Sequence, residues 1–293
     1  MTDTVLRWGN PPTGVQNAPV YRGVADAALA GAQGVSIEVT DTASGSAHAR
    51  ALVDGAFDLG HIGVAPLVAA LGRTRSHVIV GTGLLRHPPH SLIAPPGVHG
   101  LREVAGRPVA LNSRGTCSEQ IFLALLAREH LRPDEVAMAA LGDAPAIVSA
   151  IRRDEIGAAI LWEPYTSMVL RELGWTVLVE GAEVWTPSRY CTLLYARRTL
   201  VEESPALVAA VMRAYAGCVR ASQQDTASAA QAVVARMPHV PATDIRQAVV
   251  HEAPRWCADT SLDRDLLGRA LEEPEVQARL VDGFRVAEAI LPC

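Results

Sequence analysis

The stretch Asp54-Gly55-Ala56-Phe57-Asp58-Leu59-Gly60-His61-Ile62-Gly63-Val64-Ala65-Pro66 is the part of the chain that points most directly to a fold class. Residues 58–62 predict a short strand, and residues 64–71 continue at once with an apolar helical pattern. A strand that feeds straight into a helix is the repeating unit of α/β sheets. Further units of the same kind are therefore expected on both sides of this stretch.

Similar units lie on both sides, in two sets that a proline-rich segment at 86–97 separates. The first set predicts strands at 5–8, 35–39, 58–62 and 77–81 and helices at 20–30, 47–54 and 64–71. The second set predicts strands at 108–111, 136–140, 158–161 and 175–179 and helices at 118–130 and 144–153. Helical periodicity then dominates residues 207–220, 227–236 and 242–251. These patterns predict an α/β protein of two lobes with a helical C-terminal tail.

Ligands of open α/β sheets bind beyond the carboxyl ends of the strands, so the segments at strand ends are candidate ligand loops. Six segments qualify: 10–14, 43–46, 60–63, 81–83, 112–116 and 162–164.

Three stretches of the chain also resemble a known family. Residues 54–66 are similar to the "LxxGxxDxG…xP" stretch of type II solute-binding proteins of the nitrate, sulfonate, taurine and thiamine-precursor subgroup. Residues 101–110 resemble the "dLkGkrVav" opening of that family's second lobe, and residues 151–164 its "sGxvDAavvwEP" segment. Glu155-Ile156-Gly157 departs from this pattern, because the family usually has Gly and Asp there.

The resemblance implies a two-lobed type II periplasmic-binding-protein fold that closes on its ligand by a hinge. It implies a discontinuous first lobe of residues 1–88 plus 190–293 and a second lobe of residues 89–189. The chain would cross between them near 87–91 and near 187–190. It further implies a small, anionic organic ligand in the cleft between the lobes and an ABC permease as partner.

The basic residues exclude several functions, because all 26 are arginine and the chain contains no lysine. Schiff-base chemistry with pyridoxal phosphate needs a lysine amine, and the Walker A loop ends in Lys followed by Ser or Thr. Arginine does not replace lysine in these roles, because it does not deprotonate in proteins. We therefore expect no cofactor of these kinds, and the pyridoxal-dependent pyrimidine synthases that share the family fold are excluded.

Charge, hydropathy and cysteine use limit the possible partners and the cellular compartment of the protein. A net charge of -5 argues against nucleic acid as a partner, and no apolar run approaches the length of a membrane span. No signal-peptide pattern precedes residue 5, and the five cysteines are scattered without a Cys-x-x-Cys pair. The sequence as given therefore predicts a cytoplasmic protein, or an extracytoplasmic one if a leader has been removed.

Two predicted helix starts are candidate anion sites, since helix N-termini present free N–H groups and a positive dipole end. The first is Gly45-Ser46, where Ser46 is either an N-cap or a ligand contact. The second is residues 112–116, where Arg114 is either a bidentate clamp for the anion or a solvated loop residue. Cys117 beside it is either a nucleophile with a lowered pKa or a small buried residue.

The histidines concentrate between residues 48 and 99, and we expect His48 and His61 on ligand loops and His90 beside the crossover. They suit acid–base catalysis, yet no pair has the spacing of metal ligands on one helix, so no metal is expected. Trp162 and Glu163 end a strand and either contact the ligand or serve the fold. The predicted ligand-binding set is Asn10, Thr13, Gly45, Ser46, His48, His61, His90, Ser113, Arg114, Thr116, Trp162 and Glu163.

A second hypothesis is a cytoplasmic enzyme on the same fold, a lyase or hydrolase using His48 with His61 and Cys117. Gly45-Ser46-Ala47-His48 is similar to the Gly-x-x-His loop of sulfinate desulfinases, which carries their catalytic histidine. Their nucleophilic cysteine would follow the first strand, where this chain has Asn10-Pro11-Pro12-Thr13, and their Arg-x-Gly-Gly element would fall near Leu59-Gly60-His61. A regulatory binding protein is a third possibility.

Overall fold

The computed structural model describes residues 4–25, 35–104, 106–184, 191–271 and 290. The chain divides into two compact units, of which unit 1 comprises Met1–Arg86 with Pro187–Cys293 and unit 2 comprises His87–Thr186. The expected second crossover at 187–190 lies outside the described residues.

Unit 1 is built on a five-stranded sheet of order β2-β1-β3-β10-β4. Its strands are β1 (Thr4–Asn10), β2 (Val35–Asp41), β3 (Leu59–Gly63), β4 (His77–Thr82) and β10 (Thr192–Arg197). Its helices are α1 (Ala18–Ala25), α2 (Gly45–Val53), α3 (Val64–Leu71), α8 (Arg198–Glu203), α9 (Pro205–Gln224), α10 (Thr226–Val234), α11 (Ala242–Glu252) and α12 (Arg264–Leu271), with short 3-10 turns at Val15–Asn17 and Ala253–Arg255. β1 pairs in parallel with β2 and β3, so the carboxyl ends of these three strands share one edge of the sheet.

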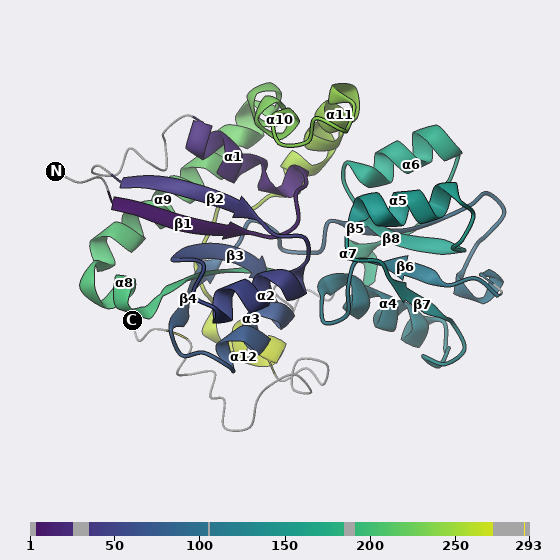
Figure 1. The fold of residues 1–293 in the computed structure, drawn as a ribbon, viewed down its shortest axis with the longest axis horizontal. Coiled ribbons are helices and arrows are strands. Elements are labelled where there is room, and N and C mark those ends of the chain that lie inside the picture. The colour runs from purple at the N-terminus through teal and green to yellow at the C-terminus, as the bar shows by residue number, and fades with distance from the viewer. Residues whose placement is uncertain (1–3, 26–34, 105, 185–190, 272–289, 291–293) are drawn as a thin grey trace. The chain divides into compact units, whose positions relative to one another are not determined.

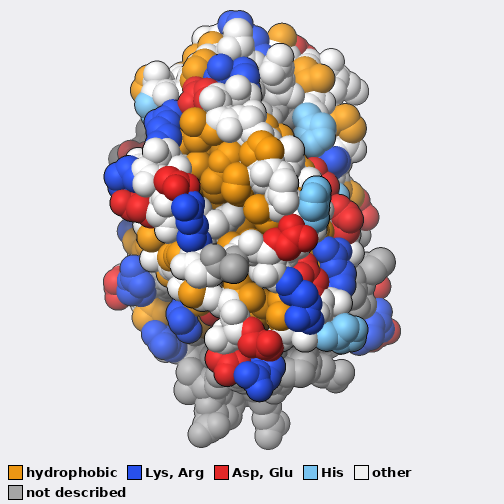
Figure 2. All heavy atoms as spheres, turned by 90° about the vertical axis from the view of Figure 1, so that its right-hand side faces the viewer, with side chains coloured by type: hydrophobic (Ala, Val, Ile, Leu, Met, Phe, Trp, Pro, Cys, Tyr) orange, Lys and Arg blue, Asp and Glu red, His pale blue; other side chains and the backbone are white. Residues whose placement is uncertain are grey.

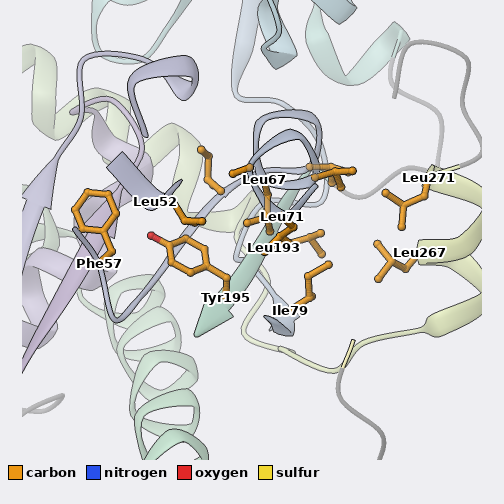
Figure 3. Close-up of a cluster of buried hydrophobic side chains, with 13 residues drawn as sticks. Leu52, Phe57, Leu67, Leu71, Ile79, Leu193, Tyr195, Leu267 and Leu271 are labelled. Carbon is orange, nitrogen blue, oxygen red and sulfur yellow. The ribbon is translucent and has the colours of Figure 1, made fainter. Parts of the chain in front are cut away.

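Helices cover both faces of this sheet, with α2, α3 and α12 on one side and α1 and α9 on the other (Figure 1). Against the first face lies a cluster of apolar side chains from α2, α3, α12 and the strands, centred on buried Tyr195 and its leucine neighbours (Figure 3). On the other face the ring of Trp8 stacks on that of Tyr215 of α9, with centroids 5.7 Å apart. The sheet is therefore fixed by burial on both sides, which places its carboxyl edge rigidly.

Unit 2 has its own five-stranded sheet of order β7-β6-β8-β5-β9. The strands are β5 (His90–Ala94), β6 (Val109–Leu111), β7 (Met138–Ala140), β8 (Ala158–Trp162) and β9 (Thr176–Glu180). The helices are α4 (Cys117–Arg128), α5 (Ala144–Arg152), α6 (Tyr165–Leu173) and α7 (Gly181–Val184), and a 3-10 turn covers Leu101–Glu103. Figure 1 shows α5 and α6 on one side of this sheet and α4 on the other.

The predicted α/β rhythm is confirmed in both units, and residues 64–71 form the helix that the opening stretch predicted. The strands β5 and β10 and the helices α6, α7, α8 and α12 were not predicted. β5 starts at His90, inside the segment expected to be an irregular crossover. β10 runs antiparallel between β3 and β4, and β5 runs antiparallel between β8 and β9, so each sheet is mixed and not purely parallel.

The family-like Asp58 stabilises the fold at the opposite edge of the unit 1 sheet. Its carboxylate accepts hydrogen bonds from the backbone N and the guanidinium of Arg7 and pairs with Arg197 at 2.6 Å. Burial alone would raise the pKa of Asp58, but the hydrogen bonds from Arg7 and the charges of Arg197 and Arg7 outweigh burial and lower it. This aspartate therefore ties β1, β3 and β10 together and is not a ligand contact.

The surface charge is of mixed sign. Figure 2 shows one face of the molecule, on which arginine and acidic side chains alternate around apolar patches. A nucleic-acid-binding face would gather its basic residues in one stripe, so this face does not have that character.

Candidate functional site

The start of α2 in unit 1 lies at the carboxyl edge of the sheet, next to the end of β1. Ser44 is the N-cap, and its hydroxyl accepts a hydrogen bond from the backbone N of Ala47 at 3.1 Å. The suggestion that Ser46 is the cap is wrong, because Ser44 has the extended backbone that a cap requires and Ser46 already lies in the helix. The first turn, Gly45-Ser46-Ala47-His48, contains no acidic side chain, so the positive end of the helix keeps its field.

Asn10, the last residue of β1, connects this helix start to the sheet. Its carbonyl oxygen accepts hydrogen bonds from the backbone N of Thr42 at 3.2 Å, the hydroxyl of Thr42 at 2.8 Å and Nδ1 of His48 at 3.0 Å. Its side chain accepts from Nε1 of Trp8 at 2.8 Å and donates to Asp41 at 3.1 Å. Asn10 is fully buried, so its polar groups hold the α2 loop in place.

His48 is held as a neutral ring. A carbonyl oxygen only accepts, so Nδ1 carries the proton that goes to Asn10, and Nε2 is then the acceptor for the hydroxyl of Tyr195 at 2.8 Å. Burial lowers the pKa of His48 to about 4, against the opposing effect of the bond to Asn10. Both nitrogens are therefore engaged inside unit 1 at neutral pH.

Two glycines make room for the Tyr195 hydroxyl. Gly9 and Gly60 are register partners on β1 and β3, and a Cβ at either would stand 2.6 Å or 2.5 Å from this oxygen. No local sequence pattern indicates Tyr195, because its role depends on β10 lying beside β3. The same contact explains why β1 and β3 each carry glycine at this level.

His61 of β3 has a different environment on the other face of the sheet. Its ring lies between Trp8 and Tyr215, with centroids 6.1 Å from each, and only 1% of the residue is exposed. Neither ring nitrogen has a hydrogen-bond partner among the described residues. Burial, followed by the charge of His48, lowers the pKa of His61 to about 3.

The start of α4 in unit 2 is organised around Asn112. Its side-chain oxygen accepts from the backbone N of Ser113 at 2.7 Å and from the hydroxyls of Thr116 at 3.0 Å and Ser118 at 2.5 Å. Thr116 is the N-cap by its extended backbone, yet its hydroxyl also donates to the Ser113 carbonyl. This loop is therefore largely closed by its own hydrogen bonds.

Glu119 gives the α4 start a negative charge of its own. Its carboxylate, which is 9% exposed, accepts from the backbone N of Gly115 at 2.7 Å and lies in the first turn of the helix. Arg114 is exposed and Cys117, the first helical residue, is partly exposed. Thr116 and Glu119 have the T-x-x-E spacing of a capping box, a sequence signal that would have indicated this carboxylate.

A third group of predicted residues lies at the carboxyl end of β8. His90 of β5 and Trp162 of β8 are register partners with ring centroids 5.5 Å apart, and Tyr165 contacts Trp162 edge-on at 6.2 Å. Glu163 precedes a cis peptide bond to Pro164, and its carboxylate accepts from the hydroxyl of Ser167 at 2.8 Å. Burial lowers the pKa of His90 to about 4.

The structure thus distributes the predicted residues among three groups. In unit 1, Asn10, Gly45, Ser46 and His48 lie at the start of α2, His61 lies on the other face of the sheet, and the partly exposed Thr13 is in the loop after β1. Unit 2 brings together Ser113, Arg114, Thr116 and Cys117 at α4, and His90, Trp162 and Glu163 at β8. Ser44, Tyr195 and Glu119 are the members that sequence reasoning missed.

The arrangement offers little for acid–base catalysis by His48, because both of its nitrogens are bonded within the core. His48 and His61 belong to unit 1, whereas Cys117 belongs to unit 2. An enzyme that uses these three residues stays a prediction. No cluster of three potential metal ligands occurs within the residues that the structure describes.

The fold is that of the two-lobed type II periplasmic binding proteins. The alkanesulfonate-binding protein SsuA from Xanthomonas axonopodis pv. citri, bound to MOPS, superposes with a TM-score of 0.83 at 17% identity, covering 99% of both chains. The periplasmic aliphatic sulphonate-binding protein SsuA from Escherichia coli gives a TM-score of 0.80 at 17% identity over 98% of this chain and 92% of that one. A DszB variant with biphenyl-2-sulfinic acid gives 0.67 at 16% identity, covering 99% and 97%.

At the level of sequence, the model of the family described as NMT1/THI5 like matches residues 18–227. The chain belongs to this family. No curated protein sequence matches the chain. Over the described ranges, no helix combines the length and apolarity needed to cross a membrane.

Proposed function

We propose that this chain is the substrate-binding protein of an ABC transporter and that it binds a small anionic organic solute, such as a sulfonate or carboxylate. The observation that carries this proposal is the start of α2. Its N–H groups lie at the carboxyl edge of the sheet, its cap is the neutral Ser44, and its first turn has no carboxylate that would compete with an anion.

The relatives support the same class of ligand. Two of the most similar structures are named for binding alkanesulfonates or aliphatic sulphonates, and one of them holds MOPS, itself a sulfonate. Such proteins deliver solute to a permease, so we propose an ABC permease as partner and an extracytoplasmic site of action.

The proposed site residues divide into those that contact the ligand and those that hold the start of α2 in position. We propose that Gly45 and Ser46 contact the anion, with Thr13 and His61 nearby on the same sheet edge, while Asn10 and His48 keep the helix start in position. In unit 2, we propose His90, Ser113, Arg114, Thr116, Trp162 and Glu163 as contacts with the remainder of the solute.

The test is a binding screen of the purified protein against sulfonates, sulfinates, carboxylates and pyrimidines. We expect at least one anionic class to raise the melting temperature by several degrees and to bind with a micromolar or lower Kd by calorimetry. Uncharged analogues of the best ligand serve as matched controls. If no anion shifts the melting temperature, or if the uncharged analogue binds equally well, the proposal is wrong.

A further inference from the structure

Two histidines of the unit 1 sheet are equally buried but differ in their partners. His77 of β4 accepts or donates at both nitrogens, with Nε2 2.9 Å from the Phe57 carbonyl and Nδ1 2.8 Å from the Ser76 hydroxyl. His61 has no hydrogen-bond partner at either nitrogen within the described part of the chain. Each is 1% exposed, so burial alone does not explain the difference.

An unpartnered buried imidazole is costly. A neutral ring presents one N–H donor and one bare acceptor, and leaving such a group without hydrogen bonds costs about 1–3 kcal/mol. Leucine or phenylalanine would fill this position between Trp8 and Tyr215 without that cost. The presence of histidine therefore points to a partner outside the described residues.

The position of His61 indicates which partner. Gly9 and Gly60 are paired, so His61 stands one residue further along β3, at the level of Asn10 at the end of β1 and two residues before the end of β3. This is the carboxyl edge of the sheet, where α/β proteins bind their ligands. We propose that His61 contacts the solute and that its neutral imidazole selects anionic solutes that also carry a hydroxyl group; this rests on the proposed function.

The chemistry favours a hydroxyl over other groups. An anionic oxygen can accept from the imidazole N–H but cannot donate to the bare nitrogen, whereas a hydroxyl can donate a hydrogen bond to that nitrogen. An ammonium group would also donate, but a buried cation needs a counter-charge. Burial and His48 are the influences that lower the pKa of His61, and neither supplies a negative charge.

The first experiment compares the unliganded stability of matched variants. We expect His61→Leu to leave the melting temperature unchanged or to raise it, because no hydrogen bond within the described structure is lost. His77→Leu is the control and should lower it by several degrees, because the Phe57 carbonyl loses its donor. A drop of similar size for both His61→Leu and His61→Phe would show that His61 serves the fold, and it would overturn the proposal.

The second experiment measures ligand selectivity by calorimetry with propanesulfonate, hydroxypropanesulfonate and aminopropanesulfonate. We expect wild type to bind the hydroxy compound at least tenfold more tightly than the other two, and His61→Leu to lose this preference while still binding propanesulfonate. An equal preference in both proteins, or a preference for the amino compound, would overturn the role of His61. If wild type binds no sulfonate but binds another anion, the same comparison is made with the hydroxylated form of that anion; if it binds no anion at all, the proposed function itself fails.

Discussion

The helix starts of α2 and α4 look alike in sequence and differ in the structure. Both follow a strand, and both begin after a short loop rich in Gly, Ser, Thr or Asn. The α2 start is capped by the neutral Ser44 and fastened to the sheet through the neutral His48. The α4 start is fastened by Asn112 and carries the Glu119 carboxylate in its first turn.

This difference changes what each helix start can bind. A carboxylate at a helix N-terminus satisfies the dipole and the free N–H groups, so it takes the place that an anionic ligand would occupy. A motif of small polar residues before a helix thus predicts an anion site only where no acidic side chain folds back onto it. The comparison favours α2 over α4 as the proposed anion site.

The largest expected effect is a loss of stability at low pH, to which the neutral His48 beside the α2 start contributes. The pKa values of buried His48 and His61, about 4 and about 3, lie below the unfolded value of 6.5. The unfolded chain therefore binds more protons below pH 6.5, so the free energy of unfolding falls as the pH falls, by about 1.4 kcal/mol per pH unit for each histidine. By pH 4 we expect a loss of about 3 kcal/mol per histidine, measured by urea unfolding across this range.

His48→Gln tests the assignment, since the amide can donate to Asn10 and accept from Tyr195 without titrating. We expect it to remove at most about a third of the pH dependence, because burial also lowers the pKa of His61 to about 3 and that of His90 to about 4. An unchanged slope would mean that His48 does not fasten α2 as a neutral ring.

The second prediction converts α2 into a copy of α4. Ala47 is the third residue of α2, as Glu119 is the third residue of α4. We expect Ala47→Glu to weaken binding of the best anionic ligand by about 100-fold in calorimetry, because like charges repel by a few kcal/mol at this range. Ala47→Gln has the same shape without the charge and should weaken binding far less; equal losses would point to steric interference.

The smallest expected effect concerns α4 itself. Glu119→Ala removes the acceptor of the Gly115 N–H and the favourable charge at the helix start, so we expect the free energy of unfolding to fall by about 1 kcal/mol. Glu119→Gln keeps an acceptor oxygen and should lose about half as much. Urea unfolding at pH 7 measures both, and a stability gain in either variant would contradict the capping role.

The sequence predicted the fold well because α/β units are local. The period of apolar residues specifies a strand or a helix within about ten residues, and the opening stretch at 54–66 gave β3 and α3 directly. It failed where an element depends on distant partners, as with β10, which is fixed by β3 and β4 on either side. The same holds for the candidate site. Gly45-Ser46 could be predicted from the neighbouring sequence, whereas Tyr195 could not, because it lies on β10.

The sequence by itself determined the α/β class, the family resemblance, the exclusion of lysine chemistry and the two helix starts. The tertiary structure decided which side chains reach those starts. It showed that the polar groups of Asn10 and His48 form hydrogen bonds inside the core and that Asp58 stabilises the fold. It also showed that Glu119 occupies the α4 start and that neither ring nitrogen of His61 has a partner in the described residues. The physical reason is that hydrogen bonds and desolvation depend on groups brought together from distant positions, which no local pattern records.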